Sequence, residues 1–151
     1  GYFGDSARVC RCTGAIIQRY LSKISGPLLD RIDLHVEVPA VPFQELRSKG
    51  DGVSSAQMRE QVETAREHQR QRGYYNSQLP PQLLRKLSAL DEAGEKTLEM
   101  AVRKMGLSAR AHDRILKVAR TVADLAGAER VSAKHVAEAV QYRSLDRNYW
   151  H

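Results

Sequence analysis

The chain has 151 residues, of which 42% are hydrophobic and only 6% aromatic, and its formal net charge is +6 at pH 7. This length fits one domain or two small ones, with a core built mostly from Leu, Val, Ala and Ile. No apolar run reaches the roughly 18–20 residues of a membrane span, and no signal peptide opens the chain, so we expect a cytoplasmic location.

The positive charge permits a polyanionic partner such as nucleic acid or nucleotide phosphate, but does not require one. Basic and acidic residues alternate along much of the chain, which is typical of solvated helix surfaces. The positive excess is larger near the start, where five basic residues accompany only Asp5 and Asp30. These five are Arg8, Arg11, Arg19, Lys23 and Arg31.

Residues 1–13 show no apolar period and are predicted to be irregular. They contain both cysteines of the chain, Cys10 and Cys12. Two thiolates one residue apart can supply half of a tetrahedral zinc site, which needs four ligands. No second cysteine pair follows, so the residues alone favour free thiols over a metal site.

Thr13 is a candidate cap for a helix that runs to Ile24. Pro27 then begins a short helical turn that ends at Arg31, because proline suits the first position of a helix. Residues 33–38 alternate apolar and polar and predict a half-buried β-strand, with His35 facing away from the core. A single strand cannot form a sheet, so its partners must come from elsewhere.

A short helix is predicted from Pro42 to Lys49, followed by a linker over residues 49–53 that is the best domain boundary. Beyond it, capping residues and apolar periodicity predict only helices. Their predicted ranges are 54–72, 83–90, 91–105, 109–126 and 132–143. The side chains expected to point inward include Met58, Val62, Ala65, Leu98, Ala101, Val102, Met105, Ile115, Val118, Ala119, Val122, Leu125, Val136, Ala139 and Val140. His112 and His135 are expected at the surface or partly buried, and Tyr142, Tyr149 and Trp150 as a small aromatic anchor.

Two arginines are the candidate functional residues. Arg31 ends the short turn, and Arg110 lies in the first turn of a capped helix, where a cation opposes the helix dipole and so needs a reason. Both suit recognition of phosphate. The plain alternatives are a surface ion pair of Arg31 with Asp30 or Asp33, and a solvated arginine at position 110. No Gly-x-x-x-x-Gly-Lys-Ser/Thr loop occurs, so this chain alone is not expected to hydrolyse ATP.

Several segments together resemble the magnesium-chelatase-like AAA+ ATPases, and in particular the ComM-type branch of that family. They are residues 1–5, 10–12, 28–39, 107–127 and 141–147. The resemblance implies a mostly α fold: residues 1–49 would be the C-terminal end of an AAA+ α/β core, carrying one strand, and residues 50–151 an all-helical lid. The chain would then be a C-terminal segment of a longer ATPase.

The resemblance also implies roles for the candidate residues. Arg31 falls where the family places its arginine finger, which reaches the γ-phosphate of the neighbouring subunit, and Arg110 where it places the sensor-2 arginine. ATP and Mg²⁺ would be bound by the longer protein, which would form a ring, expected to be a hexamer, and act on DNA rather than at a membrane. Similar proteins carry an Asn-Pro-Cys-Pro-Cys-Gly stretch upstream, so Cys10 and Cys12 would be half of a Zn²⁺ site.

Two other functions stay open at this point. One is a basic helical module that binds DNA directly through Arg114, Lys117, Arg120, Arg130 and Lys134. The other is a chelatase-type motor that acts on a protein partner; the Cys-x-Cys segment argues mildly against it.

Overall fold

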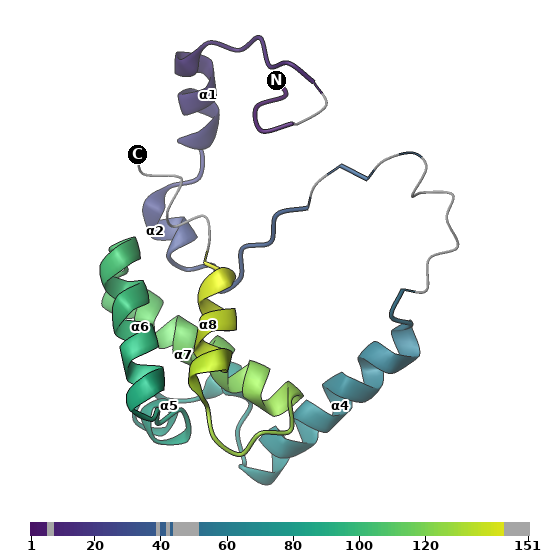
Figure 1. The fold of residues 1–151 in the computed structure, drawn as a ribbon, viewed down its shortest axis with the longest axis vertical. Helices are drawn as coiled ribbons and strands as arrows, with labels where there is room; N and C mark the ends of the chain where they lie inside the picture. The colour runs from purple at the N-terminus through teal and green to yellow at the C-terminus, as the bar shows by residue number, and fades with distance from the viewer. Residues whose placement is uncertain (6–7, 39, 42, 44–51, 144–151) are drawn as a thin grey trace.

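The structure is a computed structural model that describes residues 1–5, 8–38, 40–41, 43 and 52–143. These residues form seven α-helices and one short 3-10 helix, and none of them is in a β-strand (Figure 1). The mostly helical fold predicted from the sequence is confirmed. Nearly all of the helix predicted from Pro42 to Lys49, together with Tyr149 and Trp150, lies outside the described residues.

The two N-terminal helices are short, and α1 stands apart from the bundle. Helix α1 spans Gly14–Leu21 and buries no residue, and its N-cap, Thr13, makes no capping hydrogen bond through its side chain. Helix α2 spans Gly26–Leu29, has Pro27 in its first turn as predicted, and buries only Leu29. Figure 1 shows α1 beyond one end of the bundle, with α2 between them.

The predicted strand over residues 33–38 is wrong for the described part of the chain. The segment is extended, but it runs past the end of α8 instead of entering a sheet, and the His35 N–H donates to the Tyr142 carbonyl at 2.7 Å. His35 is consequently buried, whereas Leu34 and Val36 are exposed. The prediction that His35 faces away from the core is therefore wrong. Burial does not alternate along the segment, because Asp33 and Glu37 are exposed as well and only His35 is covered.

The remaining helices form a bundle around α7. They are α4 (Ser55–Gln71), η1 (Asn76–Gln78), α5 (Pro81–Leu87), α6 (Glu92–Met105), α7 (Ala109–Leu125) and α8 (Ala133–Gln141). Helix α7 contacts α4, η1, α5 and α8, and α6 also contacts α8. No helix in the described ranges is long and apolar enough to cross a membrane.

Local sequence signals place the helix ends. The Ser54 side chain accepts a hydrogen bond from the Gln57 N–H, and the Gln57 side-chain oxygen accepts one from the Ser54 N–H, which makes a capping box at the start of α4. Asp91 caps α6 and Ser108 caps α7 in a similar way. Gly106 ends α6 with φ of 61°, a left-handed conformation that favours glycine.

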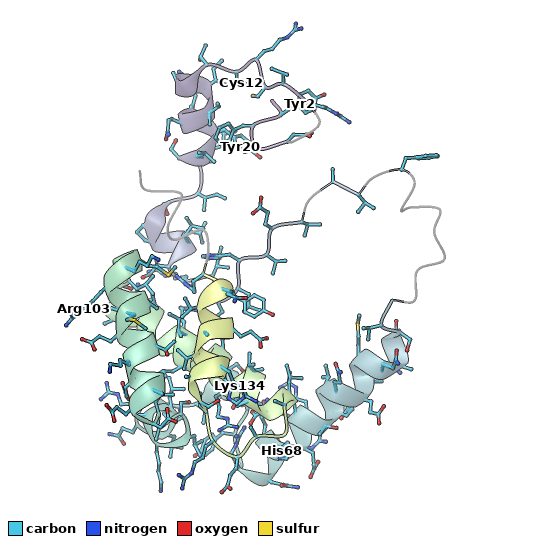
Figure 2. The ribbon with its side chains drawn as sticks, viewed as in Figure 1. Tyr2, Cys12, Tyr20, His68, Arg103 and Lys134 are labelled. Carbon is cyan, nitrogen blue, oxygen red and sulfur yellow. The ribbon has the colours of Figure 1, made fainter. Side chains whose placement is uncertain are left out.

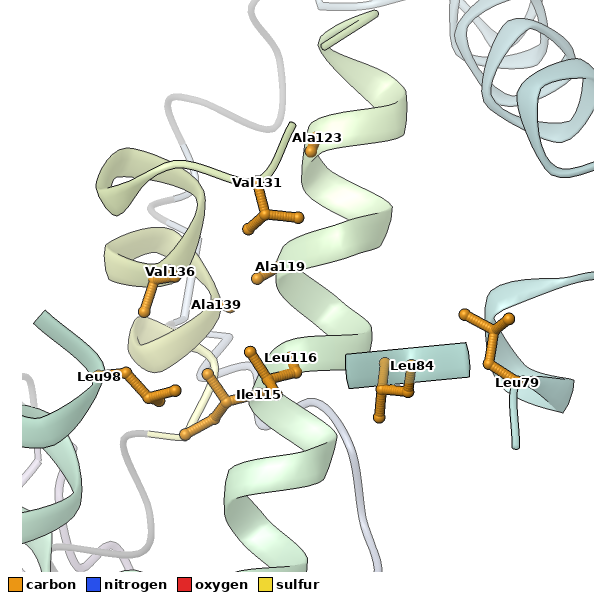
Figure 3. Close-up of a cluster of buried hydrophobic side chains, with 10 residues drawn as sticks. All are labelled: Leu79, Leu84, Leu98, Ile115, Leu116, Ala119, Ala123, Val131, Val136 and Ala139. Carbon is orange, nitrogen blue, oxygen red and sulfur yellow. The ribbon is translucent and has the colours of Figure 1, made fainter. Parts of the chain in front are cut away.

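The core lies between α7, α8, α6 and α5 (Figure 3). It consists of Leu79, Leu84, Leu98, Ile115, Leu116, Ala119, Ala123, Val131, Val136 and Ala139. Leu125 was expected inside but is 46% exposed, because it lies at the last turn of α7. Met58 and Val62 are also about half exposed; the buried residues of α4, Ala65 and Gln69, lie in its C-terminal half, so its N-terminal half projects from the bundle.

Candidate functional site

Arg110 lies at the exposed start of the central helix. The Ser108 side chain accepts a hydrogen bond from the Ala111 N–H at 3.1 Å, which fixes the first turn of α7 and with it the position of Arg110. The Arg110 side chain is 55% exposed, and its Nη1 lies 3.5 Å from the carboxylate of Asp30. The positive end of the α7 dipole and a guanidinium therefore lie at one place, which is an environment suited to an anion.

Asp30 follows the last residue of α2 and joins that helix to the start of α7. Its carboxylate oxygens accept the Ser108 hydroxyl at 3.0 and 3.2 Å. The buried guanidinium of Arg143, just beyond α8, lies 3.8 Å from the same carboxylate and donates to the Ile32 carbonyl at 2.5 Å. The segment that carries Arg31 is thus tied to the bundle through polar contacts.

Arg31 itself is exposed, and its Nη1 donates to the Pro27 carbonyl at 2.6 Å. The surface ion pair considered for Arg31 is not formed, because the described contacts of Asp30 go to Arg110 and Arg143, and Asp33 pairs with Arg114. Arg31 has no carboxylate partner among the residues described. Its one described hydrogen bond through the guanidinium is the one to the Pro27 carbonyl.

Two hollows flank the start of α7, and Arg110 lines both. The first, of about 300 Å³, lies between α2 and the turn from α6 to α7. The second, of about 550 Å³, is lined by Arg110, Arg114 and Lys117 together with Asp33 and Asp113, so three cations face two carboxylates. Its net positive charge favours an anionic ligand. Arg31 lines neither hollow.

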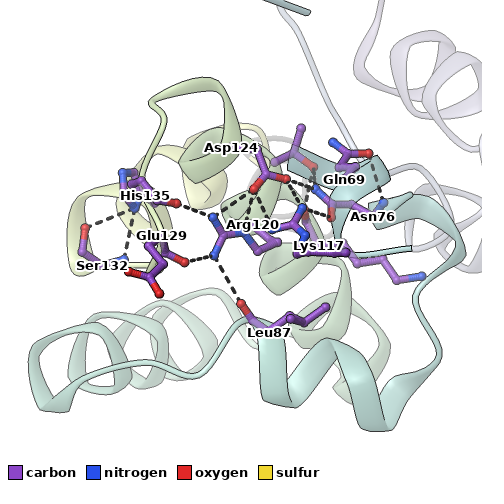
Figure 4. Close-up of polar contacts among 12 residues, drawn as sticks. Gln69, Asn76, Leu87, Lys117, Arg120, Asp124, Glu129, Ser132 and His135 are labelled. Carbon is purple, nitrogen blue, oxygen red and sulfur yellow. Dashed lines mark hydrogen bonds and ion pairs between the residues drawn. The ribbon is translucent and has the colours of Figure 1, made fainter. Parts of the chain in front are cut away.

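Arg120 is a correction to the sequence analysis, which placed it on the surface or facing DNA. Its side chain is only 2% exposed and pairs with Asp124 one turn away. It also donates to the carbonyls of Leu87, Ala128 and Glu129 (Figure 4). The available signal was its spacing: Arg120 and Asp124 each follow a buried alanine by one residue, and so share the inner side of α7.

Asp124 is the centre of this buried network. It accepts hydrogen bonds from both Nη atoms of Arg72 at 2.8 and 2.5 Å and from Asn76 at 2.8 Å. Burial would raise the pKa of the Asp124 carboxyl, but these hydrogen bonds and the charge of Arg120 outweigh it and hold the pKa below its usual value. Burial lowers the pKa of Arg120. The network joins α4, η1 and α7, and its role is structural.

The cysteines lie in the segment that precedes α1. Figure 2 shows Cys12 at the opposite end of the molecule from His68. A Cβ atom on Gly1 would lie 2.6 Å from the Cys12 Sγ and 3.3 Å from the Cys10 Sγ, so both sulfurs face Gly1. Backbone N–H groups of Cys12 and Tyr2 hold the pKa of the Cys10 thiol below its usual value. The described residues offer no third ligand, since they contain no group of three or more His, Cys, Asp or Glu side chains that could hold a metal.

Comparison with known proteins gives a consistent family. A family model described as magnesium chelatase, subunit ChlI C-terminal, matches residues 52–143, and a model for magnesium chelatase, subunit ChlI, matches residues 1–46. The second match ends at residue 46, and the first begins at residue 52.

Similar curated proteins are found in several bacteria. Competence protein ComM of Haemophilus influenzae is 46% identical over 133 residues, which is 87% of this chain and 26% of that protein. The uncharacterized protein YifB of Salmonella typhimurium is 41% identical over 141 residues, 91% of this chain and 28% of that protein. An uncharacterized protein of Mycobacterium bovis is 39% identical over 139 residues, 89% of this chain and 27% of that protein. The chain thus spans about a quarter of the length of these relatives.

Proposed function

Because this chain belongs to the magnesium chelatase subunit ChlI family, we propose that it forms the end of the nucleotide-binding core and the helical lid of an AAA+ ATPase. The core would end within residues 1–49, and the lid would comprise residues 50–151. In this proposal the longer protein binds ATP, hydrolyses it and passes the resulting motion around a ring, while this segment supplies two arginines.

The observation that carries the proposal is the exposed Arg110 in the first turn of α7. Its side chain is 55% exposed, and its one described ion pair, with Asp30, is loose at 3.5 Å. A phosphate group can replace this carboxylate, because it offers more negative charge and more acceptor oxygens. A lid arginine that binds the triphosphate and loses the contact on hydrolysis couples the lid to the nucleotide state.

Arg31 is the proposed arginine finger for the neighbouring subunit. It is exposed and has no described carboxylate partner, so its guanidinium is free to reach a phosphate outside its own chain. A guanidinium neutralises the charge that develops on the transferred phosphoryl oxygens, and such a finger is worth about 10³–10⁵ in rate. Because a finger acts in trans, Arg31 and Arg110 of one chain are not required to meet.

The described residues fit these roles but not a metal site of their own. They include no cluster of carboxylates that could hold Mg²⁺, which would therefore enter with ATP on residues of the longer protein. In this proposal Cys10 and Cys12 would supply two of the four ligands of a Zn²⁺ site, and the other two would come from outside the described residues.

DNA is the proposed substrate of the motor. The positive charge of the chain and the word competence in the name of the Haemophilus relative support it. Direct DNA binding by this segment alone is less favoured, because two of its five candidate cations are engaged elsewhere. Arg120 is buried with Asp124, and Arg114 pairs with Asp33.

The test is ATP turnover by the longer protein, with and without DNA, for the wild type, Arg31→Ala and Arg110→Ala. Both variants should lose most activity, and mixing Arg31→Ala with a variant defective in the phosphate loop should restore part of it. Normal turnover by both single variants would rule out the proposal. Full activity without any stimulation by DNA would favour a chelatase-type motor that acts on a protein partner.

A further inference from the structure

Asp30 directly precedes Arg31, and its carboxylate is the meeting point of three elements. It accepts the Ser108 hydroxyl at 3.0 Å and lies 3.5 Å from Arg110 Nη1, both at the start of α7. Arg143 Nη2, two residues beyond α8, lies 3.8 Å away. Asp30 therefore contacts Arg110 through its carboxylate and is joined to Arg31 through the backbone.

The two arginines that face Asp30 are held very differently. The Arg143 side chain is 1% exposed and is also fixed by its hydrogen bond to the Ile32 carbonyl. Arg110 is more than half exposed, and an exposed ion pair at its distance is weak. An incoming anion can thus remove Arg110 from Asp30 and leave the contacts to Arg143 and Ser108 in place.

Arg31 follows the position of α2 because its guanidinium donates to the Pro27 carbonyl in the first turn of that helix. Helix α2 has four residues, and Leu29 is the only one that it buries. Asp30 is therefore one of few contacts that hold α2 in place. The hollow of about 300 Å³ beside α2 is lined by Pro27, Asp30 and Arg110, and leaves room for a small shift of this helix.

We propose that Asp30 is a positioning residue that couples Arg110 to Arg31. This rests on the proposed function, in which both arginines contact nucleotide phosphate. When phosphate binds Arg110, Asp30 loses its ion pair with Arg110 and keeps the one with Arg143. Helix α2 then shifts toward Arg143, and Arg31 moves with it. The nucleotide state in one subunit is thereby passed to the finger that it presents to the next subunit.

The decisive variant is Asp30→Asn in the longer protein, with kcat and KM for ATP measured separately. The amide keeps an acceptor for Ser108 but removes the charge that competes for Arg110. We expect kcat to fall about 10- to 100-fold, because a small misplacement of a catalytic group has this cost. We expect KM to stay the same or fall by up to about fivefold, because the competing ion pair is gone.

Two further variants separate positioning from general damage. Glu67→Gln removes an exposed carboxylate that pairs with Arg70 on α4 and lines neither hollow, so it should leave both constants near wild type. Asp30→Glu keeps the charge and should recover part of the lost kcat. In an Arg110→Ala background, Asp30→Asn should no longer change KM, because the two residues act on each other.

The outcomes distinguish the two proposals. If Arg31→Ala and Arg110→Ala both turn over ATP normally, the proposed function itself is wrong. If those variants lose activity but Asp30→Asn matches the wild type, or raises KM without changing kcat, the coupling role of Asp30 is refuted. If circular dichroism shows that Asp30→Asn does not fold, kcat and KM are compared for Asp30→Glu instead. Constants near those of the wild type would support the role of the charge, and a kcat as low as that of Arg31→Ala would contradict it.

Discussion

Removing the charge of Asp124 is expected to destabilise the bundle more than any change at the surface. Its carboxylate receives four side-chain hydrogen bonds, from Arg72, Asn76 and Arg120. In Asp124→Asn, the Arg120 guanidinium, which is 2% exposed, would remain buried without a carboxylate. Breaking a buried ion pair on one side costs about 3–5 kcal/mol. Because a domain of this size is stable by only about 5–15 kcal/mol, this loss removes a large part of the total.

The free energy of unfolding can be measured on the 151-residue chain by urea titration followed by circular dichroism. Glu67→Gln is the matched control, since it neutralises a carboxylate that pairs with the exposed Arg70 and should cost less than about 1 kcal/mol. Arg72→Met offers an intermediate case, because Arg72 is 21% exposed and Asp124 keeps its bonds to Asn76 and Arg120. Equal stability of Asp124→Asn and Glu67→Gln would refute the structural role of the network.

Three further predictions concern the same bundle. Burial, and then the charges of its basic neighbours, lowers the pKa of His135, whose Nδ1 accepts a hydrogen bond from the Ser132 N–H. The contribution of His135 to the free energy of unfolding should therefore be complete above about pH 6.5 and decline as the pH falls toward the pKa of the folded state. His135→Gln keeps a capping acceptor and should remove this part of the slope, and an unchanged slope in urea titrations would contradict the assignment. Ile115→Ala should cost about 2–5 kcal/mol in the same titration, whereas Leu125→Ala, at a half-exposed position, should cost clearly less; similar losses would mean that the core is misplaced. Gly106→Ala should lower the melting temperature, because an L-residue is strained at φ of 61°, and an unchanged or higher value would argue against the left-handed helix end.

The sequence predicted those features that depend on neighbouring residues. The helices predicted over residues 54–72, 91–105 and 109–126 are confirmed as α4, α6 and α7. Ser54, Asp91 and Ser108 cap them, and capping needs only the next three or four residues. Arg110 lies in the first turn of α7 for the same reason. Arg31 and Arg110 are both exposed, as recognition of phosphate from outside the chain would need.

Features that depend on distant contacts were missed. Residues 33–38 have the alternation of a strand, but the segment meets the end of α8, and no sequence period reveals that partner. Arg120 was expected to be a surface residue or to contact DNA. It is buried instead, and Asp124 and three distant backbone carbonyls compensate its charge. Met58 is exposed because α4 contacts α7 only through its C-terminal half, and the position of that contact cannot be predicted from periodicity.

The contacts that hold residues 30–35 against the bundle also set an order of events in folding. The hydrogen bond from Arg143 to the Ile32 carbonyl joins residues 111 positions apart. The hydrogen bond from the His35 N–H to the Tyr142 carbonyl likewise forms only after Tyr142 has been made. During synthesis these partners are made roughly 5–20 s after the segment that they hold. The helices between them rely on contacts of shorter range and can assemble first. The two proposed phosphate-binding arginines are therefore brought into register only when the last helix of the bundle has been completed.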